Sequence, residues 1–333
     1  MLIINKKELK RLKNNFYNKK IGIIGDMMLD VYFRGEVKRI SPEAPVPVIE
    51  IDSEIFRFGG AANCALNILT LGGIPFPVGV IGNDSNGSIF NSLLKEYKID
   101  TAGILIDEDR PTTTKTRVIS DSQHIVRIDK EHKNYINSSM EKKLLDYVKS
   151  IIKDLDGIIL QDYNKGVLTP KLIKEIISLA NKNNVLITVD PKFNNFFLYK
   201  NVTLFKPNRK EAEDVLGIKI KSESDISKAG NLLLKKLKSK YILLTLGEGG
   251  VAIFQEGMDE FRIPTKARKV ADVSGAGDTV ISTLTIAMAA GADILKASYL
   301  ANYAGGLVCE EVGIVPIELD KLFNEVINER NSL

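Results

Sequence analysis

The chain contains 333 residues, of which 44% are hydrophobic and 26% are charged, and its formal net charge is +4. This composition is typical of a globular protein, with one large α/β domain and an appendage or with two modest domains. No run approaches the about 18 apolar residues of a membrane span, and no secretory signal is visible, so the sequence predicts a cytoplasmic protein without a membrane contact.

Residues 1–20 are basic and amphipathic. They hold seven Lys and Arg residues against a single acid, so the rest of the chain is nearly neutral. The apolar positions fit one face of a helix and are Leu2, Ile4, Leu9, Leu12 and Phe16. We interpret this segment as a solvated surface helix, in preference to a nucleic-acid or membrane contact.

Short apolar strands then alternate with helical stretches along most of the chain. The strands are "IGIIGD", "GIILQD", "VLITVD" and "YILLTLG", and the helical stretches are 60–71, 87–97, 140–153, 170–183 and 224–238. This alternation predicts a doubly wound, mostly parallel sheet with helices on both faces.

Two regions interrupt the alternation. Residues 31–58 and 112–130 are rich in β-branched and alternating residues and contain no helical insert. We expect them to form a small antiparallel sheet that stands off the main one. Because the second region returns to the main sheet, we interpret the pair as a lid over a site, within a single domain that spans 1–333.

Polar residues follow several of the predicted strands. They are Asp26 and Asp30, Asp162, Asp190, and Asn208 with Glu211 three residues later. Open α/β sheets bind their ligands at this edge, so we expect a site here, with Asp162 among the groups that contact substrate. The alternative for each residue alone is a helix cap or a turn, which Asp and Asn also favour.

The segment "DVSGAGDT" precedes a long apolar helix. Gly275 and Gly277 allow a ligand to approach the backbone, and the N–H groups at a helix start attract anions. A carboxylate at Asp278 is costly beside an anion unless a proton must be removed there. The segment therefore indicates a general base next to a transferring phosphoryl group, and a plain Gly-rich turn is the alternative.

Other familiar motifs are absent or incomplete. There is no P-loop, and "GEGGVA" is followed by a strand-like segment where a dinucleotide fingerprint requires a helix, so we interpret it as a hairpin beside the nucleotide. The two cysteines, Cys64 and Cys309, are expected to pack in the core. The two histidines, His124 and His132, have no metal-like partner, and we expect no catalytic role for them.

Together these motifs resemble a known family. "FGGAANCALNILTLGG" and "DVSGAGDT" are similar to the N- and C-terminal signatures of the ribokinase (PfkB) family of carbohydrate kinases, and "KPNRKEAE" and "LLTLGEGG" resemble its N-x-x-E motif and nucleotide loop. The resemblance covers nearly the whole chain. It implies a ribokinase-like fold and an ATP-dependent phosphotransferase that acts on a sugar hydroxyl.

The resemblance also implies roles for individual residues. Asp278 would be the base, and the anion hole would consist of Gly275, Ala276 and Gly277. The sugar ligands would be Asp30, Gly59, Gly60 and Asn63, and the ATP site would include Thr245, Gly247, Gly250 and Asn302. Lys192 would meet phosphates or, alternatively, would be solvated. Asn208 and Glu211 would act on Mg²⁺ through water, and Asp272 and Ser274 would hold a monovalent cation such as K⁺ in the members that use one.

Within the family, "GDMMLDVYFRGEVKRISPEAPVPVIEI", "RPTTTKTRVIS" and "QDYNKGVLT" resemble the kinases of D-glycero-D-manno-heptose 7-phosphate. A substrate of this kind needs cations for its distal phosphate. The candidates are Arg39, Lys115, Arg117, Arg127 and Lys165. Strand alternation places Lys115 and Arg117 on one face and Thr114 and Thr116 on the other, and it does not say which face meets the ligand.

The expected reaction is transfer of phosphate to the anomeric hydroxyl, giving the 1,7-bisphosphate in ADP-heptose and lipopolysaccharide synthesis. Alternatives are a related kinase for ribose, fructose phosphate or a nucleoside, a catalytically silent sugar-binding regulator, and an oxidoreductase. We expect a homodimer through the lid, involving Val46, Val48 and Ile125. Many relatives carry a second, nucleotidyltransferase domain with an H-x-G-H motif, which this sequence lacks, so a separate transferase is expected.

Overall fold

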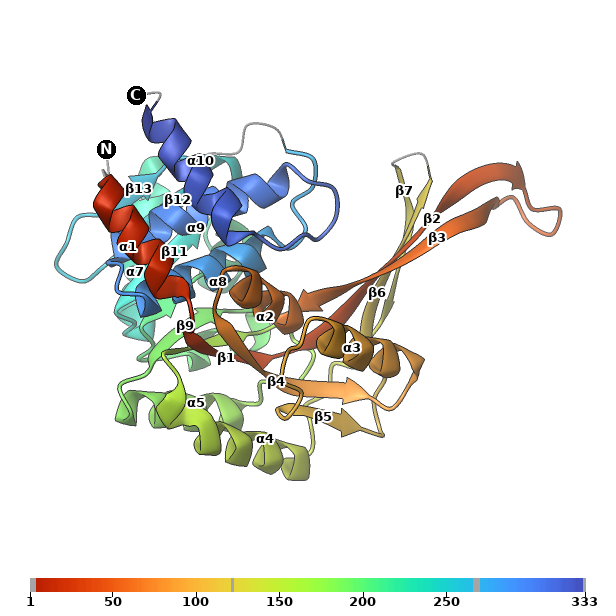
Figure 1. The fold of residues 1–333 in the computed structure, drawn as a ribbon, viewed down its shortest axis with the longest axis horizontal. Helices are drawn as coiled ribbons and strands as arrows, with labels where there is room; N and C mark the ends of the chain where they lie inside the picture. Colours follow the sequence, from red (N-terminus) through yellow and green to blue (C-terminus); the bar gives the residue numbers. More distant parts are fainter. Residues whose placement is uncertain (1–3, 121–122, 266–269, 332–333) are drawn as a thin grey trace.

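The computed structural model describes residues 4–120, 123–265 and 270–331. Its main sheet has nine strands in the order β13-β12-β11-β10-β9-β8-β1-β4-β5 (Figure 1). The strands are β1 (Lys20–Gly25), β4 (Ile74–Gly82), β5 (Ile104–Asp107), β8 (Gly157–Gln161), β9 (Leu186–Asp190), β10 (Leu204–Phe205), β11 (Tyr241–Thr245), β12 (Val251–Phe254) and β13 (Phe261–Ile263). The pairings are parallel except those of β12 with β11 and β13, which confirms the predicted fold class.

Strand β1 is the third strand from one edge of this sheet, with β4 on one side and β8 on the other. The chain first builds outward from β1 through β4 to β5, and then returns to β8 and builds in the opposite direction. The loops that leave β1 and β8 therefore diverge, and a crevice opens at the carboxyl ends of these strands. This topology locates the site.

Helices cover both faces of the main sheet (Figure 1). One hydrophobic core includes side chains of α1 (Lys6–Phe16), α2 (Ala61–Thr70), α3 (Ser85–Glu96), α8 (Ala276–Ala289), α9 (Ile294–Cys309) and α10 (Leu319–Asn331). A second core includes those of α4 (Ser138–Ile151), α5 (Pro170–Lys182), α6 (Arg209–Leu216) and α7 (Glu223–Leu237). Short 3₁₀ helices are η1 (Ile152–Asp154), η2 (Phe193–Leu198) and η3 (Gly247–Gly249). No described helix is both long and apolar enough to span a bilayer.

Helix α8 begins differently from most of the other helices. Side chains such as Asn5, Asp84 and Thr169 cap the first N–H groups of α1, α3 and α5. The residue before α8 is Gly275, in the left-handed conformation with φ of 79°, and it offers no side-chain cap. The N–H groups of this first turn therefore remain available to a ligand.

A four-stranded sheet in the order β3-β2-β6-β7 projects from the body (Figure 1). Its strands are β2 (Met27–Ile40), β3 (Pro47–Gly60), β6 (Thr113–Ser120) and β7 (Gln123–Lys130). The expectation of an antiparallel sheet holds for β2 with β3 and for β6 with β7, but β2 and β6 are parallel. The reason is that the chain passes through α2, β4, α3 and β5 between them, so β6 leaves the main sheet in the same direction as β2.

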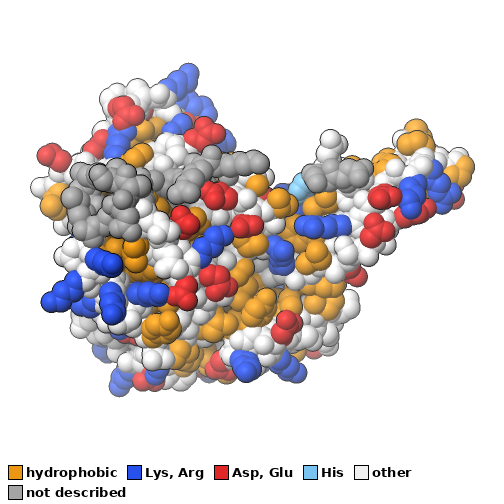
Figure 2. All heavy atoms as spheres, turned by 45° about the horizontal axis from the view of Figure 1, so that its top comes forward, with side chains coloured by type: hydrophobic (Ala, Val, Ile, Leu, Met, Phe, Trp, Pro, Cys, Tyr) orange, Lys and Arg blue, Asp and Glu red, His pale blue; other side chains and the backbone are white. Residues whose placement is uncertain are grey.

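The two faces of the projecting sheet differ in character. Asp30 is aligned with Lys115, and Lys115 is aligned with Asp129, so these charged side chains share one face. Large apolar side chains remain exposed on the projecting strands and on the loop between β2 and β3, and they are Val37, Ile40, Val46, Ile51, Ile125, Val126 and Ile128. Figure 2 shows hydrophobic side chains on this part of the surface.

Candidate active site

Asp278 lies in the first turn of α8 and is only 2% exposed. Its carboxylate accepts hydrogen bonds from the side chains of Asn63 (2.9 Å), Gln161 (3.0 Å) and Tyr163 (2.8 Å). Burial raises the pKa of Asp278 to about 6, although the hydrogen bonds from Asn63 and Tyr163 oppose the shift. A carboxylate held in one orientation with a pKa close to neutrality is suited to general-base catalysis.

The start of α8 also carries the expected anion cradle. A side chain on Gly277 would approach Asp190 Oδ2 at 3.6 Å and Lys206 Nζ at 3.7 Å, so the backbone here faces that ion pair. Lys206 is 3% exposed, and its ammonium lies 2.9 Å from the Asp190 carboxylate. Helix N–H groups and a lysine thus meet beside the base, which favours the binding of a phosphoryl group.

A cavity of about 800 Å³ opens from this cradle. Eight of the residues predicted from sequence line it, and they are Lys192, Asn208, Thr245, Gly247, Gly250, Ala276, Gly277 and Asn302. Gly247 and Gly250 both have positive φ, at 62° and 77°, in the turn between β11 and the antiparallel β12. The hairpin interpretation of "GEGGVA" is therefore confirmed, and the cavity is large enough for a nucleotide.

Asn208 and Glu211 form a capping box at the start of α6. The Asn208 side chain accepts from the Glu211 N–H at 2.8 Å, and the Glu211 carboxylate accepts from the Asn208 N–H at 2.8 Å. The other carboxylate oxygen of Glu211 is paired with Lys192. No group of three or more His, Cys, Asp or Glu residues in the described part of the chain could enclose a metal ion. An ion that keeps most of its waters and touches a single carboxylate still fits this arrangement.

The predicted sugar ligands lie where the projecting sheet meets the body. Asp30 is 2% exposed and forms an ion pair with Arg117. Burial raises the pKa of Asp30, and the Arg117 guanidinium opposes this shift. A side chain on Gly59 would lie only 2.1 Å from Asp30 Oδ2, so the glycine leaves room for the carboxylate. Gly60, at φ of 55°, turns the chain into α2, which carries Asn63 to the base.

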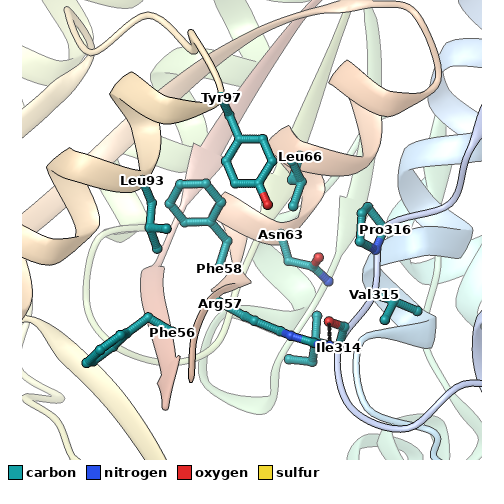
Figure 3. A pocket seen from close by; sticks show the side chains of 10 residues that line it. All are labelled: Phe56, Arg57, Phe58, Asn63, Leu66, Leu93, Tyr97, Ile314, Val315 and Pro316. Atoms are coloured by element: carbon teal, nitrogen blue, oxygen red, sulfur yellow. Dashed lines mark hydrogen bonds between the residues drawn. The ribbon is translucent and has the colours of Figure 1, made fainter. Parts of the chain in front are cut away.

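A second cavity, of about 190 Å³, lies between β3, α2, α3 and residues 314–316. Figure 3 shows Asn63 among its lining side chains, with Phe58, Leu66 and Tyr97 around it. Arg57 crosses the cavity and donates to the carbonyl of Ile314. Most of the side chains that line this cavity are apolar, and one of the polar ones, Asn63, also bonds Asp278.

Of the predicted substrate ligands, Asn63 lines the smaller cavity and the others line neither cavity. Three of them are held by other partners. Asp162 is buried, and its carboxylate accepts from the Tyr199 hydroxyl at 2.6 Å and from the Asn164 N–H, which gives it a structural role in the loop. The ammonium of Lys165 lies 2.5 Å from Glu131. Arg127 is exposed and pairs with Asp129 at 2.9 Å.

The other predicted residues are placed as follows. Arg39 is exposed near the end of β2 that is farthest from Asp30. The Asp272 carboxylate accepts from the backbone N–H of Ser274 at 2.8 Å and of Gly313 at 3.1 Å. Cys64 is buried as predicted. Cys309 is partly exposed and lines the large cavity, so it does not pack in the core, because α9 ends beside the start of α8.

Sequence reasoning missed the roles of Gln161, Tyr163 and Lys206. Gln161 ends β8, Tyr163 lies two residues beyond it, and both donate to Asp278. Lys206 follows β10 and lies near Gly277. Each lies at or just after the end of a strand, so the rule that ligands gather at strand ends makes them candidates without giving their partners. The Tyr163 N–H is itself held by the buried carboxylate of Asp26 at 2.7 Å.

Comparison with known proteins agrees with this geometry. The chain matches the family described as pfkB family carbohydrate kinase over residues 18–320. It is 43% identical over 304 residues to the "Bifunctional protein HldE" of Helicobacter pylori strain J99, covering 91% of this chain and 65% of that protein. It is 40% identical over 307 residues to the protein of the same name from Desulfatibacillum aliphaticivorans, covering 92% and 63%. The chain thus spans about two thirds of the length of these relatives.

Solved structures show the same fold at lower sequence identity. Arabidopsis thaliana ribokinase, in complex with ribose and ATP, has a TM-score of 0.72 and 19% identity, covering 92% of this chain and 99% of that one. Phosphofructokinase-2 of Escherichia coli, in a tetrameric inhibited form, has a TM-score of 0.74 and 18% identity, covering 93% and 99%. The family match over most of the chain shows that the chain belongs to the pfkB family of carbohydrate kinases and is an ATP-dependent sugar kinase.

Proposed function

We propose that the protein transfers the γ-phosphoryl group of ATP to the anomeric hydroxyl of D-glycero-D-manno-heptose 7-phosphate. The observation that carries the reaction type is the buried Asp278 carboxylate beside the uncapped start of α8. The substrate is supported by the identity to proteins named HldE, together with the sequence resemblance to the heptose kinases. The product would be the 1,7-bisphosphate.

The geometry supports a direct mechanism. Asp278 takes the proton of the anomeric hydroxyl, while Asn63, Gln161 and Tyr163 hold the carboxylate in position. The N–H groups of Ala276 and Gly277, together with Lys206, stabilise the negative charge of the transferring group. Asp30 orients the sugar by accepting from its hydroxyls. Closure of the projecting sheet as a lid would exclude water and favour transfer over hydrolysis of ATP.

ATP in this family is used with a divalent ion, and we propose Mg²⁺. Glu211 and Asn208 would hold it through water, and the ion would neutralise charge on the β- and γ-phosphates. Lys192 pairs with Glu211 at the edge of the nucleotide cavity, where it can reach phosphate oxygens. Asp272 and Ser274 remain a proposed site for K⁺.

We further propose a homodimer formed through the projecting sheet, because that sheet exposes a row of large apolar side chains. The product of an anomeric kinase is a sugar 1-phosphate, which a nucleotidyltransferase converts to an activated sugar. We therefore propose that a transferase consumes the product after its second phosphate has been removed, in a route to ADP-heptose and lipopolysaccharide. A cytoplasmic location follows from the use of ATP.

A substrate panel tests the proposal. ADP release with Mg·ATP is measured against D-glycero-D-manno-heptose 7-phosphate, sedoheptulose 7-phosphate, ribose, fructose 6-phosphate and adenosine. We expect the manno-heptose phosphate to have the highest kcat/KM. Preference for another sugar would keep the base and change the substrate. Tight sugar binding without turnover of any of them would instead favour a regulator that has lost catalysis.

A further inference from the structure

We propose that Lys115 is the residue that binds the distal phosphate of the sugar substrate and makes the enzyme selective for a phosphorylated sugar. This inference rests on the proposed function, because it assumes that the acceptor is a sugar phosphate. It goes further by choosing one cation among those that the projecting sheet presents.

The first argument is position. Lys115 is aligned with Asp30 across the β2–β6 pair, so its side chain shares the face of the sheet that carries the proposed sugar ligand. Its ammonium lies 5.2 Å from the centre of the Tyr163 ring, whose hydroxyl bonds Asp278. Lys115 therefore lies next to the space that a sugar held by Asp30 would occupy, within reach of a phosphate that the sugar carries.

The second argument is that neighbouring cations already have partners. Arg117 is paired with Asp30, and Arg127 is paired with Asp129. The Lys165 ammonium is paired with Glu131, and Arg57 donates to the carbonyl of Ile314. By contrast, no hydrogen bond or ion pair joins the Lys115 ammonium to any residue that the structure describes; its neighbour is the Tyr163 ring.

The third argument is the partial burial of the Lys115 ammonium. Lys115 is partly buried, and burial lowers its pKa below the ordinary lysine value, with the Asp30 carboxylate opposing the shift and the Lys165 ammonium adding to it. A charge that loses water without gaining a partner is destabilising. A phosphate dianion at this point would compensate the charge and supply the missing hydrogen-bond acceptors, and a neutral sugar could not.

Lys115→Met tests the inference, because methionine keeps much of the unbranched side chain of lysine and removes its charge. We measure kcat/KM for the heptose 7-phosphate and for the same heptose without its phosphate, in the wild type and in K115M. We expect the ratio of the two kcat/KM values to fall by about 10- to 100-fold, mainly through KM for the phosphorylated sugar, while KM for ATP stays the same. Lys115→Arg should restore part of the preference.

Lys130→Met is the matched control, because Lys130 is aligned with Thr114 on the other face of the sheet and pairs with Asp84 at the surface. It should leave the ratio unchanged. An unchanged ratio in K115M would overturn the inference, and so would an equal loss on both sugars, which would place Lys115 at the transferring phosphoryl group. If the wild type phosphorylates other sugars but not the heptose 7-phosphate, the proposed function fails and this inference fails with it. Unfolding midpoints show whether each variant is folded.

Discussion

At the scale of single residues, the proposed mechanism depends most on Asp278. Replacement by Asn keeps the size of the side chain but removes the ability to accept a proton. We expect Asp278→Asn to lower kcat by about 10²–10⁴-fold, the usual contribution of a general base, and to leave ATP binding largely intact. Steady-state kinetics and calorimetric titration with ATP measure the two effects.

The control for this variant is Asp320→Asn, which makes the same change in a side chain that is 77% exposed and paired with Lys13. It should leave kcat near the wild-type value. Near-wild-type turnover in Asp278→Asn would contradict the assignment of the base.

The pKa of Asp278 predicts how activity depends on pH. Burial raises the pKa of this carboxyl to about 6, and only the deprotonated form can accept a proton. We therefore expect kcat/KM to rise with pH from 5 to about 7, with an apparent pKa near 6, and then to level off. A profile that stays flat from pH 5 to 8 would show either a lower pKa or a different base. The profile is measured at subsaturating sugar, so that it reports the free enzyme.

At the scale of elements, the site depends on how closely β3 approaches β2. The Asp30 carboxylate lies where a side chain on Gly59 would lie, with only 2.1 Å between them. Gly59→Ala should therefore displace Asp30 and its ion pair with Arg117, without requiring an unusual backbone conformation. We expect KM for the sugar to rise by about 10-fold or more, in line with the loss of a charge-assisted hydrogen bond, and KM for ATP to change little.

Ser53→Ala provides the comparison, because Ser53 is exposed in the same strand. It should change neither KM. A sugar KM that is unaffected by Gly59→Ala would mean that Asp30 does not orient the sugar.

At the scale of the whole molecule, the projecting sheet exposes large apolar side chains to solvent in a monomer. Ile51 is 55% exposed and Ile128 is 54% exposed, on strands that extend away from the body. We expect the wild type to be a dimer by light scattering at micromolar concentration, and the double variant Ile51→Glu/Ile128→Glu to be a monomer, because buried carboxylates would be costly.

Met258→Glu is the control for that experiment, since Met258 is 65% exposed in a loop beyond β12. It should leave the dimer intact. A wild-type monomer would refute the proposed dimer, and a dimeric double variant would place the interface elsewhere.

The sequence by itself determined the fold class and the family, and it predicted a base and a set of residues for the nucleotide. Strands and helices follow from local periodicity. The "GAGD" and "GEGG" segments require particular backbone conformations, which the glycines within them reveal. Asp278, Gly275 and Gly277 were therefore proposed without the structure, which places all three at the start of α8.

Only the tertiary structure decided how distant segments meet. The parallel register of β2 and β6 aligns Asp30 with Lys115, and no local pattern encodes a pairing between residues so far apart in the chain. The partners of the neighbouring cations, such as Asp30 for Arg117 and Glu131 for Lys165, are also known only from the folded chain. The roles of Gln161, Tyr163 and Lys206 also emerge only when β8, β10 and α8 converge at one edge. Periodicity is a property of neighbouring residues, whereas hydrogen-bond partners and burial are set by the packing of the whole chain.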